Sequence, residues 1–189
     1  MRTRIKAAIA AAILVGALAL TGCTSDHQGH GSSSSASSTS STSGEMDHPM
    51  DGGPAPAGIK EAPSPTYPVG TKVTLKADHM DGMKGAEATI VGAFDTHTYA
   101  VNFTPTTGGE PITDHRWVVQ EELEGVGDEL LPEGATVTLD AAHMTGMKGA
   151  EATIASSTSQ TVYMVDYTWD GMTITNHKWV VESEIQPAS

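Results

Sequence analysis

A twelve-residue stretch occurs twice in this chain and constrains its fold more than any other feature. Residues 79–90 read HMDGMKGAEATI and residues 143–154 read HMTGMKGAEATI, so the copies differ only at Asp81 and Thr145. A duplication of this kind predicts two structurally similar units in tandem. The Gly-rich start of each copy indicates a tight turn, and its end has the composition of a strand.

Alternating apolar and polar residues follow each copy, which is the pattern of a β-strand with one buried face. The apolar positions are Tyr99, Val101 and Phe103 in the first unit and Tyr163, Val165 and Tyr167 in the second. Each unit then ends on a Trp-Val-Val run. A flat sheet of this size would leave long edges exposed, so we expect closure into a barrel or roll. The sequence predicts an all-β fold of two small SH3-like units, repeat unit 1 over residues 67–124 and repeat unit 2 over residues 131–187.

The N-terminus has the features of an export leader. Basic residues precede an apolar run over residues 7–20 that is short for a membrane span. The run ends in Leu20-Thr21-Gly22-Cys23, which resembles a bacterial lipobox. We therefore expect a signal peptide over residues 1–22, a lipid on Cys23, and an extracytoplasmic protein anchored to the cell membrane. Since Cys23 is the only cysteine, an intramolecular disulfide is excluded.

Residues 23–66 have the composition of a disordered tether, because they are rich in Ser, Thr and Pro and poor in large apolar residues. Two clusters of potential metal ligands interrupt this tract. They contain His27, His30, Met46, His48 and Met50. The clusters are interpreted either as weaker metal sites or as parts of an ordinary polar linker.

The charge balance excludes one class of partner. The chain has 10 Lys and Arg against 23 Asp and Glu, a net charge of −13. Binding to nucleic acid requires basic side chains for the phosphates, so we expect no nucleic-acid partner. An acidic surface is compatible with cation binding, and equally with a soluble acidic protein that has no such role.

The residues required for common catalytic mechanisms are missing from the sequence. The single cysteine lies in the lipobox, most serines lie in the tether, and neither a Walker loop nor a His-Glu-x-x-His motif occurs. No pair of carboxylates stands out as a general acid and base. We therefore expect a protein that is not an enzyme.

Each duplicated stretch offers an imidazole and two thioethers at a turn. Imidazole binds several transition metals, whereas a thioether is soft and favours Cu(I). We predict Cu(I) sites that use the side chains of His79, Met80 and Met83 in one unit and of His143, Met144 and Met147 in the other, with His115 and His177 as further donors. The alternative is that the methionines fill the core and the histidines are hydrogen-bonded residues.

Several of these motifs together resemble a known family. They are His-Met-x-Gly-Met-Lys-Gly-Ala in both units, Thr104-Pro105-Thr106-Thr107-Gly108-Gly109, and the His-Arg-Trp-Val and His-Lys-Trp-Val runs at residues 115–118 and 177–180. The chain is similar to the YdhK-like, or CopL-like, copper-binding lipoproteins, whose tandem domain was long of unknown function. The resemblance covers residues 69–185. The second unit departs from the pattern at Trp169-Asp170-Gly171.

This resemblance implies an extracytoplasmic lipoprotein that sequesters copper, as Cu(I), in copper tolerance. The sequence leaves a second function open, namely a non-enzymatic SH3-like interaction module that binds a peptide or a cell-wall component. In that case the His-Met corner would be a packing motif. No protein partner is indicated by the sequence.

Overall fold

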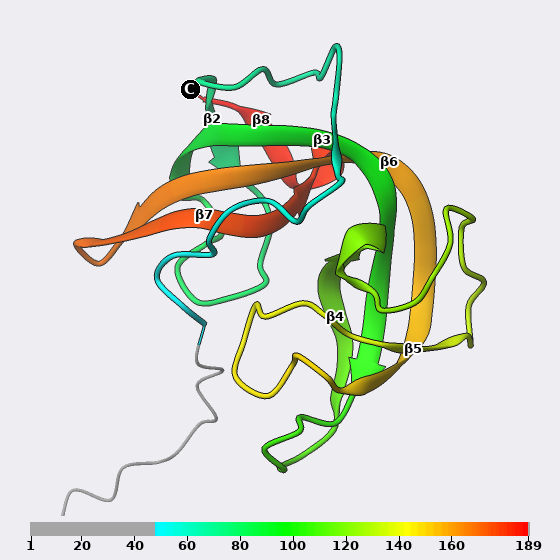
Figure 1. Cartoon of the computed structure of the whole chain (residues 1–189). Coiled ribbons are helices and arrows are strands. Elements are labelled where there is room, and N and C mark those ends of the chain that lie inside the picture. Colours follow the sequence, from blue (N-terminus) through cyan, green and yellow to red (C-terminus); the bar gives the residue numbers. More distant parts are fainter. Residues whose placement is uncertain (1–47, 189) are drawn as a thin grey trace, which may run out of the picture. The chain divides into compact units, whose positions relative to one another are not determined.

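The computed structural model describes residues 48–188, and these residues form an antiparallel β-structure (Figure 1). The predicted all-β class is confirmed. The predicted signal peptide, Cys23, His27, His30 and Met46 lie outside the described residues. No helix within residues 48–188 is long and apolar enough to cross a membrane. The elements in chain order are β1 (Lys60–Glu61), β2 (Lys72–Leu75), β3 (Glu87–Phe103), β4 (Ile112–Val119), η1 (Gln120–Glu122), β5 (Thr136–Thr138), β6 (Glu151–Trp169), β7 (Met172–Val181), η2 (Glu182–Glu184) and β8 (Ile185–Pro187).

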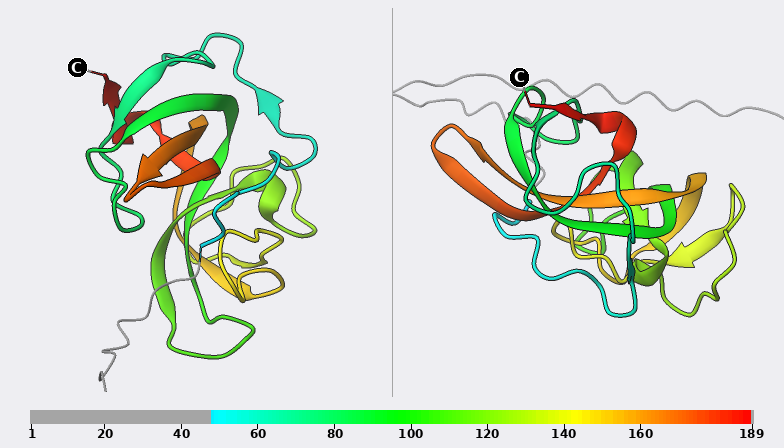
Figure 2. Two further views of the ribbon diagram at one scale, coloured as in Figure 1. Left: turned by 90° about the vertical axis from the view of Figure 1, so that its left-hand side faces the viewer. Right: turned by 90° about the horizontal axis from the view of Figure 1, so that it is seen from above.

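Strands β3 and β6 form the long central ladder of the sheet. They pair antiparallel along almost their whole length, from Ala88 opposite Tyr167 to Phe103 opposite Ala152. The two strands bend together, and the register shifts between Ile90 and Gly92 and again between Ala100 and Val101 (Figures 1 and 2). Such irregularities let a long ladder curve, so each half of the ladder can cover a different core.

Each half of the β3–β6 ladder belongs to one lobe, and each lobe takes half of each repeat. The first lobe combines β2 and the start of β3 with the end of β6, β7 and β8; the second combines the end of β3 and β4 with β5 and the start of β6. The hydrophobic cores confirm this exchange, because Leu75 and Ile90 share a core with Tyr163, while Tyr99 shares a core with Leu139.

Neither repeat therefore closes on itself, which the repeat boundaries do not predict. The physical reason is strand length. Strands of 17 and 19 residues extend beyond one small core and carry each repeat into its neighbour. The pairing is symmetric: Ala88 opposite Tyr167 corresponds to Phe103 opposite Ala152 when the repeats are interchanged. The SH3-like layout stays a prediction.

The described part of the predicted tether is ordered, which corrects the expectation of disorder for residues 48–66. Residues 48–62 form a strap that crosses the seam between the lobes (cyan in Figure 1). Ala55 and Ile59 pack on a third apolar cluster, and β1 pairs with β3. Residues 48–62 cannot form a core of their own. They are ordered because they pair with an edge of the sheet and pack on its apolar surface, which their composition does not reveal.

The exchange of halves predicts that the repeats fold only together. Residues 48–128 and 129–189, prepared as separate polypeptides, should each lack a cooperative unfolding transition. Each fragment would expose one hydrogen-bonding edge of its long strand and would contain only half of each core. Mixing them should restore the transition, and urea titration followed by circular dichroism measures it. A well-dispersed NMR spectrum from either fragment alone, at a concentration where it is monomeric, would contradict the exchange.

Candidate metal centre

The carboxylate of Glu122 accepts hydrogen bonds from three donors in the second lobe. This glutamate lies in η1, its side chain is 6% exposed, and its Oε1 lies 2.8 Å from Nε2 of His143. The indole Nε1 of Trp179 donates to Oε2 at 2.9 Å, and the backbone N–H of Val119 donates to the same oxygen at 3.3 Å. Burial alone would raise the pKa of Glu122, but the His143 ring and the hydrogen bonds from His143 and Trp179 outweigh it and lower that pKa.

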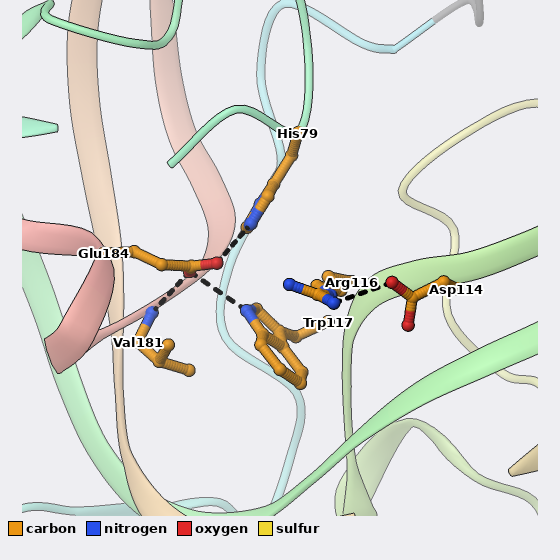
Figure 3. Close-up of polar contacts among 6 residues, drawn as sticks. All are labelled: His79, Asp114, Arg116, Trp117, Val181 and Glu184. Atoms are coloured by element: carbon orange, nitrogen blue, oxygen red, sulfur yellow. Dashed lines mark hydrogen bonds and ion pairs between the residues drawn. The ribbon is translucent and has the colours of Figure 1, made fainter. Parts of the chain in front are cut away.

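The same arrangement recurs in the first lobe, where Glu184 of η2 replaces Glu122 (Figure 3). His79 Nε2 lies 2.7 Å from Glu184 Oε1. Trp117 Nε1 and the Val181 backbone N–H donate to Oε2 at 3.0 and 3.1 Å. In both lobes the Glu comes from one repeat, and the His and Trp come from the other. Each centre is therefore a joint product of the two repeats.

The carboxylate determines which nitrogen of His79 and His143 can bind a metal. Because an ionised carboxylate only accepts, Nε2 donates to it, which makes Nδ1 the lone-pair nitrogen of the neutral ring. Nδ1 of both rings is buried and has no hydrogen-bond partner among residues 48–188. A carboxylate that holds the remote nitrogen is the usual outer-shell support of a metal-bound histidine. In both rings, Nδ1 is therefore a buried, oriented nitrogen whose lone pair is available to a metal ion.

His115 on β4 and His177 on β7 are buried histidines of a second kind. Their Nε2 atoms are also buried without a partner in the described part of the chain. Burial, followed by the neighbouring His143, His48 and His79, lowers the pKa of His115 to about 3. Burial, followed by His79 and the other three rings, lowers the pKa of His177 to about 3. Both imidazoles are therefore neutral at pH 7, the state that a metal ligand requires.

The structure brings five predicted histidines together at the seam between the lobes. The ring centroids of His115 and His143 are 6.2 Å apart, and those of His48 and His115 are 6.5 Å apart with nearly parallel planes. His79 and His177 belong to the same group, because His79 lowers the pKa of both His115 and His177, and His48, His115 and His143 also lower the pKa of His177. Within residues 48–188, no three His, Cys, Asp or Glu side chains already stand in an arrangement that holds a metal ion. A bound ion would thus use fewer imidazoles, small ring rotations, or thioethers as well.

The methionines occupy two different environments. Met83 and Met147 are fully buried in the cores of the first and second lobes. Met144 is 8% exposed, and Met80 is partly buried at the edge of the first core. Core packing accounts for Met83 and Met147, and their role as ligands stays a prediction. Met50 lies in the strap and is half exposed.

Sequence reasoning missed the two glutamates. Glu122 and Glu184 each lie five residues after the repeated Trp, at Trp117 and Trp179, so the repeat held a usable signal. The neighbouring acidic residues obscured it. The sequence also could not show that each glutamate serves the His and Trp of the other repeat.

Comparison with known proteins gives consistent matches over the duplicated region. The family model described as "Protein of unknown function (DUF1541)" matches residues 69–120 and 133–182. An uncharacterized protein, YdhK of Bacillus subtilis (strain 168), is 50% identical over 143 residues, which cover 75% of this chain and 69% of the relative.

Solved structures of YdhK from Bacillus subtilis are similar to this chain. A crystal structure at 2.00 Å resolution has a TM-score of 0.71 and 49% identity, covering 72% of this chain and 94% of the other. A solution NMR structure of the YdhK C-terminal domain has a TM-score of 0.62 and 51% identity, covering 64% of this chain and 93% of the other.

Removing the Glu122 carboxylate should destabilise the fold more than removing that of Glu184. Glu122→Ala leaves an indole N–H, an imidazole N–H and a backbone N–H without an acceptor, and we expect a loss of about 3 kcal/mol in the free energy of unfolding. Glu184→Ala is the matched control with the same donors but a side chain that is 15% rather than 6% exposed. Urea unfolding measures both variants, and an equal or larger loss for Glu184→Ala would contradict this ranking.

Stability should fall as the pH drops below about 6.5. Unfolded histidines bind protons below their ordinary pKa of 6.5, whereas folded His115 and His177 do not until about pH 3. Between pH 6.5 and pH 3 the unfolded chain thus binds more protons than the folded chain. Each of the two histidines therefore lowers the free energy of unfolding by up to about 1.4 kcal/mol for every pH unit of acidification. Urea unfolding at pH 7.0 and 5.5 with a chelator measures this slope. His115→Gln with His177→Gln should flatten it, while an unchanged slope would contradict the assignment.

Proposed function

We propose that this chain, which belongs to the DUF1541 family, is a membrane-anchored extracytoplasmic lipoprotein that binds Cu(I) at the histidine centre and sequesters it in copper tolerance. The observation that carries the proposal is a set of four buried ring nitrogens, on His79, His115, His143 and His177, that have no hydrogen-bond partner within residues 48–188. Two of these imidazoles, His79 and His143, are oriented by a carboxylate. Buried polar atoms in a native protein nearly always have a partner, so such a set points to a ligand.

The chemistry of the donors favours copper over harder cations. Neutral imidazoles are suited to copper and zinc, whereas Ca²⁺ and Mg²⁺ prefer oxygen ligands. The glutamates Glu122 and Glu184 direct their oxygens at His, Trp and backbone donors. With these carboxylates engaged, the proposed donors at the seam are the ring nitrogens and the thioethers of Met80 and Met144, which directly follow the oriented histidines. Cu(I) accepts low coordination numbers, which fits imidazoles that approach one another mainly in pairs.

The expected location agrees with this chemistry. A thioether needs no deprotonation and forms no disulfide, so it stays available to a metal in an oxidising compartment outside the cytoplasm. Cys23 and the leader, on which the membrane anchor depends, support the same assignment from the sequence alone. The protein would then hold copper next to the membrane without catalysing a reaction.

Replacing the oriented imidazoles should weaken copper binding at little cost in folding. The double variant His79→Gln and His143→Gln keeps a donor to each glutamate but removes the ring Nδ1, and we expect the Cu(I) affinity to fall at least about tenfold. Anaerobic titration of the mature chain against a competing Cu(I) chelator measures this. His97→Gln is the matched control, because His97 bonds Asp128 and Ser159 away from the centre. Unchanged affinity in the double variant would refute the proposal.

A second pair of variants tests the thioethers. Met80→Leu with Met144→Leu should weaken Cu(I) binding more than Met83→Leu with Met147→Leu, because the latter pair is fully buried in the two cores. Leu keeps nearly the same volume, so both variants should fold. The reverse order would make Met83 and Met147 the stronger ligands among the four methionines that the sequence predicted.

A further inference from the structure

The strap binds to the sheet as an extended segment along the edge of β7. The backbone N–H of Thr175 donates to the Met50 carbonyl at 2.9 Å, and the N–H of Gly52 donates to the Thr175 carbonyl at 2.9 Å. Asp51 thus lies opposite Thr175 in a parallel bridge. Adding a strand to a sheet edge is how many domains bind peptides, so the strap shows how the edge of one repeat accommodates such a segment.

Three positions of the strap make this docking specific. His48 Nδ1 lies 3.0 Å from the His143 carbonyl oxygen. The Asp51 carboxylate accepts from the Asn176 side-chain amide at 2.9 Å. A Cβ at residue 52 would lie 2.1 Å from the Asn176 carbonyl oxygen, so only glycine fits there. This edge of β7 therefore accepts a histidine, an acceptor side chain three residues later, and a glycine directly after it.

The duplication places the same surface in the other lobe, where residues 48–188 leave it as a cavity of about 440 Å³. The three residues that contact the strap all have counterparts in the lining of this cavity. They are His79, Thr113 and Asp114, at the positions of His143, Thr175 and Asn176. Figure 3 shows His79 and Glu184 on one side and Arg116 and Asp114 on the other.

The backbone around Thr113 is arranged for the same kind of docking. β4 pairs with β3 in the register in which β7 pairs with β6, since Val101 opposite His115 corresponds to Val165 opposite His177. The φ angles of the next residue also agree, at 54° for residue 114 and 52° for residue 176. The N–H and C=O of Thr113 are therefore directed as those of Thr175 are, and they can accept an extended segment in parallel.

The two edges differ in the polarity of one contact residue, because Asp114 replaces Asn176. Arg116 Nη2 donates to Asp114 Oδ2 at 2.7 Å, and the carboxylate has lone pairs left for a further donor. A segment with the Asp51 carboxylate would place two negative groups side by side here. An asparagine at that position would instead donate its amide to Asp114, which is the Asp51–Asn176 pair with its two partners exchanged.

We propose that this cavity binds an extended segment of a partner protein that carries a histidine, an asparagine three residues later and a glycine directly after it. The histidine bonds the His79 carbonyl, the asparagine lies opposite Thr113 and donates to Asp114, and the glycine lies against the backbone of residue 114. The first lobe thus binds in another protein the kind of segment that the second lobe binds in its own chain. The proposal requires no metal and goes beyond the proposed function.

Two synthetic peptides test this docking in NMR titrations of the mature chain with a chelator present. One has the sequence of strap residues 48–57, HPMDGGPAPA, and the other has asparagine in place of its aspartate. The asparagine peptide should shift the Thr113 amide and bind at least about tenfold more tightly than the aspartate peptide. In Asp114→Asn the order should reverse, because that variant recreates the Asp51–Asn176 pair and releases Arg116 to face the aspartate.

Two controls separate docking in the cavity from other effects. The asparagine peptide with alanine in place of its first glycine should not bind, because its Cβ would meet the backbone of residue 114 as one at residue 52 would meet that of Asn176. The Thr175 amide should stay unchanged in every titration, since the strap keeps its place.

Four results would overturn the proposal. They are no shift at Thr113 with the asparagine peptide at concentrations up to about 1 mM, the same preference in the parent and in Asp114→Asn, equal binding of the alanine peptide, and a shift at Thr175 in place of Thr113. A Thr113 amide that is already protected from hydrogen exchange without peptide would also overturn it, because the cavity would then be filled by the chain itself or by a second copy.

Discussion

The antiparallel pairing of β3 with β6 is the interaction on which the rest of the structure depends. It joins the repeats along their longest strands and divides each of them between two cores. Without this ladder, the His and Trp of one repeat would not meet the Glu of the other. The bends near Gly92 and Ala100 direct the two ends of the ladder to opposite lobes, so backbone irregularity positions the candidate metal centre.

The two Glu-His-Trp groups show how a buried charge can be tolerated at a candidate ligand site. Glu122 is nearly inaccessible, yet three donors compensate its desolvation, and the balance lowers its pKa. The same bonds fix the ring of His143 and direct its second nitrogen inward. One carboxylate therefore serves the fold and the site together, and a substitution there should affect both stability and metal affinity.

Much of the architecture follows from local sequence, whereas the exchange does not. Period-two alternation around Tyr99 and Tyr163 predicted strands there, though not their lengths of 17 and 19 residues, and the duplicated stretch predicted the symmetry. The neighbours of a repeated strand depend on contacts far apart in the chain, and Leu75 carries no mark that its core partner is Tyr163. The histidines were predicted from their type. Glu122 and Glu184 were missed because an acidic residue next to others normally indicates a solvated surface.

Shared construction of both centres also limits how the protein could have evolved. A single-repeat ancestor would have had to pair with a second copy of itself to complete either lobe, so the present chain has the form of a fused homodimer. Because the two halves lie in one chain, corresponding positions can differ, as Asn176 and Asp114 do. Deleting one repeat would leave neither Glu-His-Trp group complete, because each group takes its Glu from one repeat and its His and Trp from the other.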